Sequence, residues 1–201
     1  MTNKKIALTG GIASGKTTVA NKLKELGAII LDADEYARRV VEPGTPSWDG
    51  LRELLGSAYF DREGCLKRRE LRERIIADPD CRKKVDEVLH PFIVRAMWAE
   101  WETQRRLHPD VPVIFDIPLL FEGGFDKDFD LIILVYVPAE VQVERLIERD
   151  GIDRKEAEGT LSMQFSIDSK KALSHHIIDN SRDFAGTLRQ VEEVWKKLRQ
   201  E

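Results

Sequence analysis

Two hydrophobic patterns alternate along the chain. Short uninterrupted apolar runs are typical of strands buried on both faces of a parallel sheet, whereas apolar residues recurring every three to four positions are typical of amphipathic helices. The runs predict strands at residues 6–8, 28–31, 111–116, 131–137 and 177–178. The periodic stretches predict helices at residues 18–26, 139–149, 157–165 and 183–199. This alternation predicts an α/β fold with a parallel central sheet.

A long helical insertion separates the second predicted strand from the third. Turn-forming residues divide it at 43–44, 61–64 and 78–79. The predicted helices of the insertion are 36–41, 48–55, 68–76, 81–89 and 92–107. His90-Pro91 is therefore expected to lie between two helices, where His90 either contacts substrate or ends a helix.

Composition excludes several classes of protein. The chain has 201 residues, of which 42% are hydrophobic and 34% are charged, and this suits one globular α/β domain with an insertion rather than a disordered chain. The net charge of −4 argues against a broad nucleic-acid surface. No apolar run is long enough to span a bilayer, and a polar N-terminus leads into a strand. We therefore expect no membrane partner and a cytoplasmic location.

Some residue types that often carry chemistry receive a structural interpretation. Cys65 and Cys81 have no metal or redox spacing, so we interpret both as ordinary thiols. No histidine or cysteine near His90 has ligand spacing, which argues against metal binding there. We interpret His175-His176 as surface or strand-edge residues. Trp98 and Trp101 lie within one helical turn of each other and are interpreted as packing residues.

Residues 10–17, Gly-Gly-Ile-Ala-Ser-Gly-Lys-Thr, carry the most specific signal in the chain. They fit G-x-x-x-x-G-K-[ST], the phosphate-binding loop (P-loop) of nucleotide-binding proteins. A predicted strand precedes the loop and a predicted helix follows it, which argues against a chance match. Backbone N–H groups at the helix N-terminus surround phosphates. Lys16 can reach the β- and γ-phosphates, and the Thr17 hydroxyl can ligate Mg²⁺.

A P-loop by itself does not identify the reaction. A small-molecule kinase, a GTPase switch and an ATP-driven motor or binding module all contain one. The guanine-reading string N-K-x-D does not occur. Residues 61–64 match D-x-x-G, but they lie in the helical insertion, so we interpret them as a turn. Motors usually need a longer chain, and a kinase therefore fits best.

Three carboxylates follow predicted strands. Asp32 and Asp34 end the second one, where they can face different sides. A carboxylate beside an acceptor hydroxyl can orient it and take its proton. We favour this role for Asp34, which can also cap the next helix, and give Asp32 a supporting role. Asp116 ends the third strand and either holds Mg²⁺ or is a carboxylate without metal; both interpretations stay open.

Arg145 and Arg149 follow the fourth predicted strand and share one helix face. Such arginines can neutralise the charge on a phosphoryl group during transfer. Alternatively they lie on a solvated surface with Glu144 and Glu148 as partners. Their place after the fourth strand favours the functional interpretation.

Taken in order, these motifs resemble the dephospho-CoA kinase family. Leu8 to Ala20 is similar to its P-loop, and Leu31-Asp32-Ala33-Asp34 with the following Ala37-Arg38 and 41–44 is similar to its acceptor-site block. Leu89-His90-Pro91 and residues 116–122 (Asp-Ile-Pro-Leu-Leu-Phe-Glu) are similar to its substrate-side motifs. Ile178-Asp179-Asn180 is similar to its C-terminal block. The match runs from about Lys4 to the last helix.

The resemblance implies ATP-dependent phosphorylation of the ribose 3′-hydroxyl of dephospho-coenzyme A, the last step of coenzyme A synthesis, with ATP and Mg²⁺ as cofactors. It implies a three-layer P-loop fold with a nucleotide core at 1–33, 111–138 and 170–201, a helical substrate domain at 34–110 and a lid at 139–169. The oligomeric state stays open.

The resemblance also assigns residues. Asp34 is the expected base, with Lys16 and Arg145 as the other catalytic residues. The expected nucleotide-binding residues are Gly11, Ala13, Ser14, Gly15, Lys16, Thr17, Thr18, Arg145 and Asn180, the last near the adenine. The expected substrate-binding residues are Asp34, His90, Pro118, Leu119, Leu120 and Glu122. Apart from the resemblance, the P-loop motif makes Thr17 an expected metal ligand, and the strand-end Asp116 is the second candidate.

The chain departs from the family pattern at a few positions. Ala13 replaces a usual glycine, which we expect to be tolerated if its φ stays below zero. Thr17 stands where Ser is common and keeps the hydroxyl. Residues 163–165 and 174–176 also differ from the usual small and acidic residues.

Overall fold

A computed structural model describes residues 4–200 of the chain. Its strands are β1 (Ile6–Gly10), β2 (Ile29–Asp32), β3 (Val113–Asp116), β4 (Leu131–Tyr136) and β5 (His176–Asp179). All pair in parallel, in the order β2-β3-β1-β4-β5. The predicted parallel α/β sheet is confirmed. Parallel pairing brings the carboxyl ends of all five strands to one edge, which is where ligands bind in such sheets.

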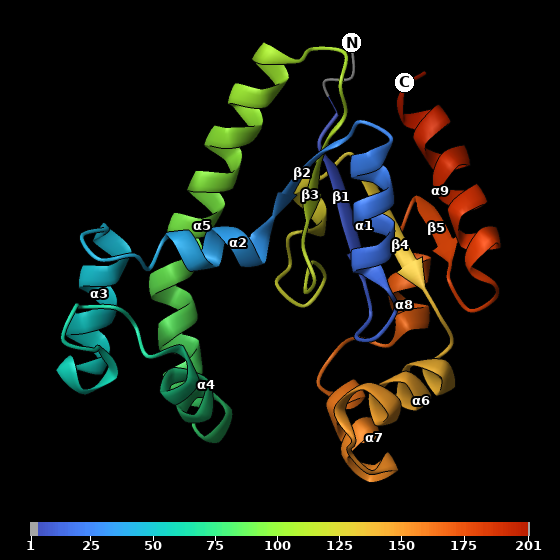
Figure 1. Cartoon of the computed structure of the whole chain (residues 1–201). Helices are drawn as coiled ribbons and strands as arrows, with labels where there is room; N and C mark the ends of the chain where they lie inside the picture. The colour runs from blue at the N-terminus through green and yellow to red at the C-terminus, as the bar shows by residue number, and fades with distance from the viewer. Residues whose placement is uncertain (1–3, 201) are drawn as a thin grey trace. The chain divides into compact units, whose positions relative to one another are not determined.

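Helices are packed on both faces of this sheet. On one face, α1 (Lys16–Glu25) and α9 (Phe184–Leu198) lie side by side (Figure 1), and their apolar sides form one buried cluster with the strands. The α9 residues of this cluster are Val191, Val194, Trp195 and Leu198. On the other face, the short helix α8 (Ile167–Ala172) lies against β4, with the Lys171 ammonium 4.5 Å from the centroid of the Tyr136 ring. Phe115 packs there against Phe129, with their ring centroids 5.1 Å apart. The core is therefore three-layered.

Two further helices follow β4 and lie beside the loop between β1 and α1 (Figure 1): α6 (Ala139–Asp150) and α7 (Arg154–Ser162). Gly151 ends α6 in the left-handed region, which glycine adopts at low cost. Asp153 begins α7 with a capping box that it forms with Glu156. The short helix α8 then leads into β5. Sequence reasoning missed α8 because six residues are too few to establish a period.

The contacts divide the chain into two units, one of residues 1–32 and 101–201 and the other of residues 33–100. The second unit contains α2 (Ala33–Arg39), α3 (Pro46–Leu55), α4 (Arg68–Ala77) and most of α5 (Pro79–Leu107). Thr45 caps α3, and Pro46 occupies its first turn. The helices enclose a cluster that includes Leu51, Phe60 and Val85. The insertion therefore has its own hydrophobic core.

The prediction of two helices on either side of His90-Pro91 is wrong. A single helix, α5, runs from Pro79 to Leu107 and contains Pro91 in its interior. Trp101 on its last third packs against Phe115 of the sheet, with ring centroids 6.4 Å apart. Residues 101–107 belong to the core unit, whereas the helical domain was expected to extend to 110. The contact with Phe115 confirms Trp101 as a packing residue.

The expected position at the end of the second strand is correct for Asp32 but wrong for Asp34. Asp32 is the last residue of β2, but Asp34 lies in the first turn of α2, which begins at Ala33. The alternation of faces along a strand therefore does not apply to this pair. Nor does Asp34 occupy the capping position, although an acidic side chain in a first helical turn interacts favourably with the helix dipole.

None of the helices formed by residues 4–200 combines the length and hydrophobicity that a membrane crossing requires.

Candidate active site

The loop between β1 and α1 presents unused backbone donors. Within the loop, the Ser14 N–H donates to the Gly11 carbonyl over 3.1 Å and the Thr18 N–H donates to the Gly15 carbonyl over 3.0 Å. Among loop residues 12–17, all of which the structure describes, the N–H groups that have no acceptor are those of Ala13, Gly15, Lys16 and Thr17. Such a group of donors at a helix N-terminus forms an anion-binding concavity.

Two residues of the loop have positive φ. Gly15 has φ of 85°, and a Cβ there would overlap the amide nitrogen of Asn180, so only glycine fits. Ala13 has φ of 57°. The condition under which alanine was expected to be tolerated here, a negative φ, is therefore not met. The loop requires left-handed backbone at this position, and alanine adopts it at a cost.

Polar side chains hold the outward-facing carbonyl groups of the loop. Gln142 Nε2 donates to the Ile12 oxygen over 2.6 Å, and Asn180 Nδ2 donates to the Ser14 oxygen over 2.8 Å. Asn180 is in turn held by Thr187, whose hydroxyl donates to Asn180 Oδ1 over 2.9 Å. The loop is therefore fixed from outside by residues of α6, α9 and the segment after β5.

Arg145 on α6 contacts the same region. Its Nη2 donates to the Asn180 oxygen over 2.8 Å, and its Nη1 donates to the Ala13 oxygen over 3.4 Å. Arg149, one turn further along α6, instead pairs with Asp150 at 2.7 Å and is exposed. Of the two arginines, the structure brings only Arg145 to the P-loop. Arg149 fits the solvated-surface alternative, with Asp150 rather than Glu144 or Glu148 as its partner.

Lys16 and Asp116 form an ion pair at the carboxyl edge of the sheet. The Asp116 residue is 5% exposed, and it lies level with Leu8 of β1 and Asp32 of β2 in the parallel register. The Thr17 hydroxyl group belongs to an exposed residue at the start of α1. Hydroxyl and carboxylate oxygens are the donors that Mg²⁺ prefers, so this donor set fits the ion.

The loop after β3 carries the other expected substrate residues. The Pro118 carbonyl accepts from the Thr9 hydroxyl over 3.3 Å. Leu119 is 39% exposed, whereas Leu120 is fully buried. Of the two leucines, the side chain of Leu119 alone faces solvent, and Leu120 contributes to the core.

Glu122, at the end of this loop, makes two contacts, one of them with a buried side chain. Its Oε1 lies 2.7 Å from the ammonium of the fully buried Lys170 and accepts from the Phe165 N–H over 2.9 Å. These contacts connect the loop to α8 and to the segment just before it. Lys170 was missed by sequence reasoning, because nothing local distinguishes it from the exposed Lys171.

In the helical unit, His90 lies on an exposed part of α5. It lines a shallow surface hollow with residues of the same helix, namely Pro79, Arg82, Lys83, Asp86 and Glu87. Two basic and two acidic side chains balance each other there, so the hollow has no strong preference for an anion. Asp34 is exposed in the first turn of α2.

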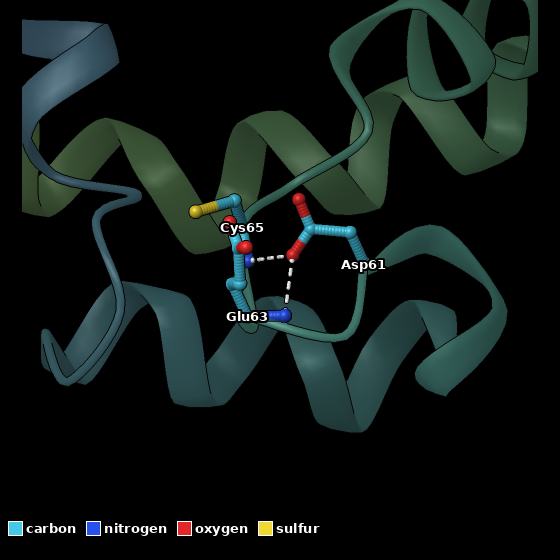
Figure 2. Close-up of side chains that lie close together, drawn as sticks. All are labelled: Asp61, Glu63 and Cys65. Carbon is cyan, nitrogen blue, oxygen red and sulfur yellow. Dashed lines mark hydrogen bonds between the residues drawn. The ribbon is translucent and has the colours of Figure 1, made fainter.

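The D-x-x-G string forms a turn in the helical unit, as predicted (Figure 2). Asp61 Oδ1 accepts from the Glu63 N–H over 3.0 Å and from the Cys65 N–H over 2.8 Å. The three side chains lie close together, but all are exposed, and these hydrogen bonds explain the position of Asp61. Cys65 and Cys81 are free thiols, as expected.

The sequence profile of the dephospho-CoA kinases matches residues 4–185. The chain belongs to the dephospho-CoA kinase family. A dephospho-CoA kinase of Geobacter metallireducens is 42% identical over 193 residues, which cover 96% of this chain and 95% of that protein. The chain is therefore a kinase, and membership of the dephospho-CoA kinase family implies ATP-dependent phosphorylation of dephospho-CoA in coenzyme A biosynthesis.

Solved structures share the fold. A dephospho-CoA kinase from Campylobacter jejuni superposes with a TM-score of 0.76 at 21% identity, covering 98% of this chain and 97% of that one. A shikimate kinase from Acinetobacter baumannii superposes with a TM-score of 0.52 at 18% identity, covering 97% and 92%. The dephospho-CoA kinase family thus shares the P-loop kinase fold with enzymes that use other acceptors.

Proposed function

We propose that the chain transfers the γ-phosphoryl group of ATP to the ribose 3′-hydroxyl of dephospho-CoA. The group of free N–H donors beside Lys16, in a chain of this family, carries the proposal. Phosphoryl transfer depends almost entirely on positioning and on stabilising the negative charge of the phosphates. The donors around Lys16 provide both for the β- and γ-phosphates.

The proposed roles of the core residues follow from their chemistry. Thr17 and Asp116 would hold Mg²⁺, which, when bound, neutralises phosphate charge. Lys16 contacts the phosphates and is kept near the edge of the sheet by its ion pair with Asp116. Arg145 adds a cation beside the loop, and Asn180 orients the loop next to the adenine site.

Asp34 is the proposed base. In the reaction, the 3′-oxygen forms a bond to the γ-phosphorus while the bond from phosphorus to the β–γ bridging oxygen breaks, and ADP leaves. The hydroxyl proton moves to the Asp34 carboxylate. His90, Pro118, Leu119 and Glu122 are the proposed acceptor-side residues. We also propose that the enzyme works in the cytoplasm, where ATP is abundant.

An acceptor panel tests the reaction. The protein is incubated with ATP·Mg²⁺ and dephospho-CoA, a nucleoside, a nucleotide or shikimate, and ADP release is followed. We expect ADP release that depends on dephospho-CoA, and no release above background with its 3′-deoxy analogue. Release with another acceptor would identify a different metabolite kinase, and nucleotide binding without turnover would identify a binding module.

Two variants test the residues. Asp34→Asn is expected to lower kcat by about 10²- to 10⁴-fold, the usual contribution of a general base, while ATP affinity stays near normal. Glu35→Gln is the matched control because it removes the neighbouring exposed carboxylate of the same turn. Near-normal turnover of Asp34→Asn would remove this residue from the base role.

Lys16→Ala is expected to weaken ATP binding as well as turnover.

A further inference from the structure

Ile12, in the middle of the P-loop, is held from two sides by glutamines of the segment that follows β4. Gln142 Nε2 on α6 donates to its carbonyl oxygen over 2.6 Å. Gln164 Oε1, two residues after α7, accepts from its N–H over 3.2 Å. The Ile12 side chain packs against the apolar cluster of α6 and α7 that includes Leu146. Backbone and side chain of Ile12 are therefore both fixed by this segment.

The position of Gln142 leaves little freedom to the loop. Gln142 is 3% exposed, and a Cβ at Gly11 would overlap its amide nitrogen. The backbone defines which way the amide points, because the Ile12 carbonyl can only accept and the Ile12 N–H can only donate. Gln142 must therefore present its NH₂ group, and Gln164 must present its oxygen.

The direction of a peptide group links Gln142 to the nucleotide. In a planar trans peptide the C=O and the N–H point in opposite directions. The peptide that contains the Ile12 carbonyl also contains the Ala13 N–H, which is one of the free loop donors. When Gln142 holds the carbonyl outward, it aims the Ala13 N–H into the loop. Asn180 does the same for the peptide that contains the Ser14 carbonyl and the Gly15 N–H.

We propose that Gln142 is a positioning residue for nucleotide phosphates, acting through the Ile12–Ala13 peptide, and that Gln164 supports it by holding the Ile12 N–H. This inference rests on the ATP-binding half of the proposed function and does not depend on the acceptor. Without Gln142, the Ile12–Ala13 peptide can rotate, and the Ala13 N–H no longer points at a fixed place.

The same substitution at the two glutamines tests the proposal. Gln142→Glu places an acceptor against the Ile12 carbonyl, whereas Gln164→Glu keeps an acceptor for the Ile12 N–H. Both variants add one negative charge next to Ile12. A difference between their ATP affinities therefore cannot come from the added charge alone. Gln142→Met is neutral and of similar length, and it removes only the donor. Affinities for ATP and AMP are measured by competition with a fluorescent ATP analogue, without any acceptor, and folding is checked by circular dichroism.

We expect Gln142→Met to weaken ATP binding about tenfold and Gln142→Glu to weaken it further. Without the Gln142 donor, the Ala13 N–H loses its fixed direction and with it the hydrogen bond to a charged phosphate. Gln164→Glu is expected to stay within about threefold of the unmodified protein, because it retains the Ile12 hydrogen bond. AMP, which lacks the β- and γ-phosphates, is expected to lose much less affinity than ATP in both Gln142 variants.

Three outcomes overturn the proposal. The first is normal ATP affinity in Gln142→Met. The second is equal weakening by the two glutamates, which would show an effect of charge alone. The third is equal loss of ATP and AMP affinity, which would show a general loss of structure. If the unmodified protein binds ATP but shows no dephospho-CoA-dependent turnover, the proposed reaction fails while this inference is still tested.

Discussion

At the scale of single residues, Ala13 combines backbone strain with a useful contact. Its φ of 57° is unfavourable for any residue with a Cβ, by about 1–2 kcal/mol. Its methyl group packs against the apolar cluster of α6 and α7, and its N–H is one of the free donors of the P-loop. Alanine has the smallest side chain that can make such a packing contact. It therefore holds the loop against the α6 and α7 cluster with the smallest steric penalty at positive φ.

Substitutions at Ala13 are expected to separate strain from packing. Ala13→Val should lower the free energy of unfolding by about 1–2 kcal/mol, because a β-branched residue is poorly tolerated at positive φ. Ala13→Gly should stay within about 1 kcal/mol of the unmodified protein, because the relief of strain offsets the lost methyl contact. Urea unfolding measures both changes. The control Ala185→Val, on an exposed helical turn, should cost less than about 0.7 kcal/mol. Equal losses for the two valines would contradict the strain at Ala13.

At the scale of elements, α5 is the least expected feature. A proline inside a helix removes one hydrogen bond and clashes with the carbonyl four residues earlier, here that of Glu87. The helix nevertheless continues through Pro91, because both of its ends are held by packing. Val85 lies in the core of the helical unit, and Trp101 packs on Phe115 in the core unit. Tertiary contacts therefore override the local signal for a break.

Replacing this proline is expected to stabilise the protein. Pro91 is exposed, so Pro91→Ala leaves no cavity. The gain is about 3 kcal/mol from the helix, reduced by up to about 1 kcal/mol because alanine loosens the unfolded chain, which leaves about 2 kcal/mol. Thermal and urea unfolding measure this change. The control is Arg95→Ala, at an exposed residue one turn further along α5, for which we expect the free energy of unfolding to change by less than about 0.5 kcal/mol. A destabilised Pro91→Ala would show that Pro91 itself stabilises the native helix.

At the scale of the whole molecule, carboxylates in both units favour their charged form. The Cys81 backbone N–H, which donates to Asp78, lowers the pKa of that carboxyl, and a hydrogen bond from Arg154 lowers the pKa of Glu140. Burial acts to raise the pKa of Asp179, but hydrogen bonds from the hydroxyl and backbone of Ser181 outweigh it, so this pKa is also lowered. The folded state therefore binds fewer protons than the unfolded chain at acidic pH.

The sign of the pH dependence follows from these shifts. A carboxyl with a lowered folded pKa stabilises the protein above its unfolded pKa of about 4, and this contribution disappears as the pH falls through the lower, folded value. We expect the urea midpoint to drop below about pH 4.5. Asp179→Asn keeps an oxygen that accepts from the Ser181 N–H but does not titrate. The urea midpoint of this variant should therefore fall less at acidic pH. Two results would contradict these shifts: a urea midpoint that rises on acidification, or a urea midpoint that falls with pH as steeply in Asp179→Asn as in the unmodified protein.

The P-loop and the sheet could be predicted because their signals are local. Each strand contains an uninterrupted apolar run, and the loop residues are consecutive, so spacing alone identifies them. Gln142 could have been noticed, since it lies three residues before Arg145 and therefore shares its helix face. Its role could not be predicted, because Gln142 and Ile12 are separated by 130 positions in the sequence. For Asn180 and Ser14 the separation is 166 positions.

The sequence by itself determined the α/β class, the phosphate-binding loop and the resemblance to the dephospho-CoA kinases, since all three depend on residue type and spacing over short ranges. The tertiary structure decided the strand order, the continuity of α5 through Pro91, the positive φ of Ala13 and the side chains that hold the loop carbonyls. The physical reason is common to these features. Each depends on a balance between a small local cost and contacts with residues distant in sequence, and that balance exists only once the chain has folded.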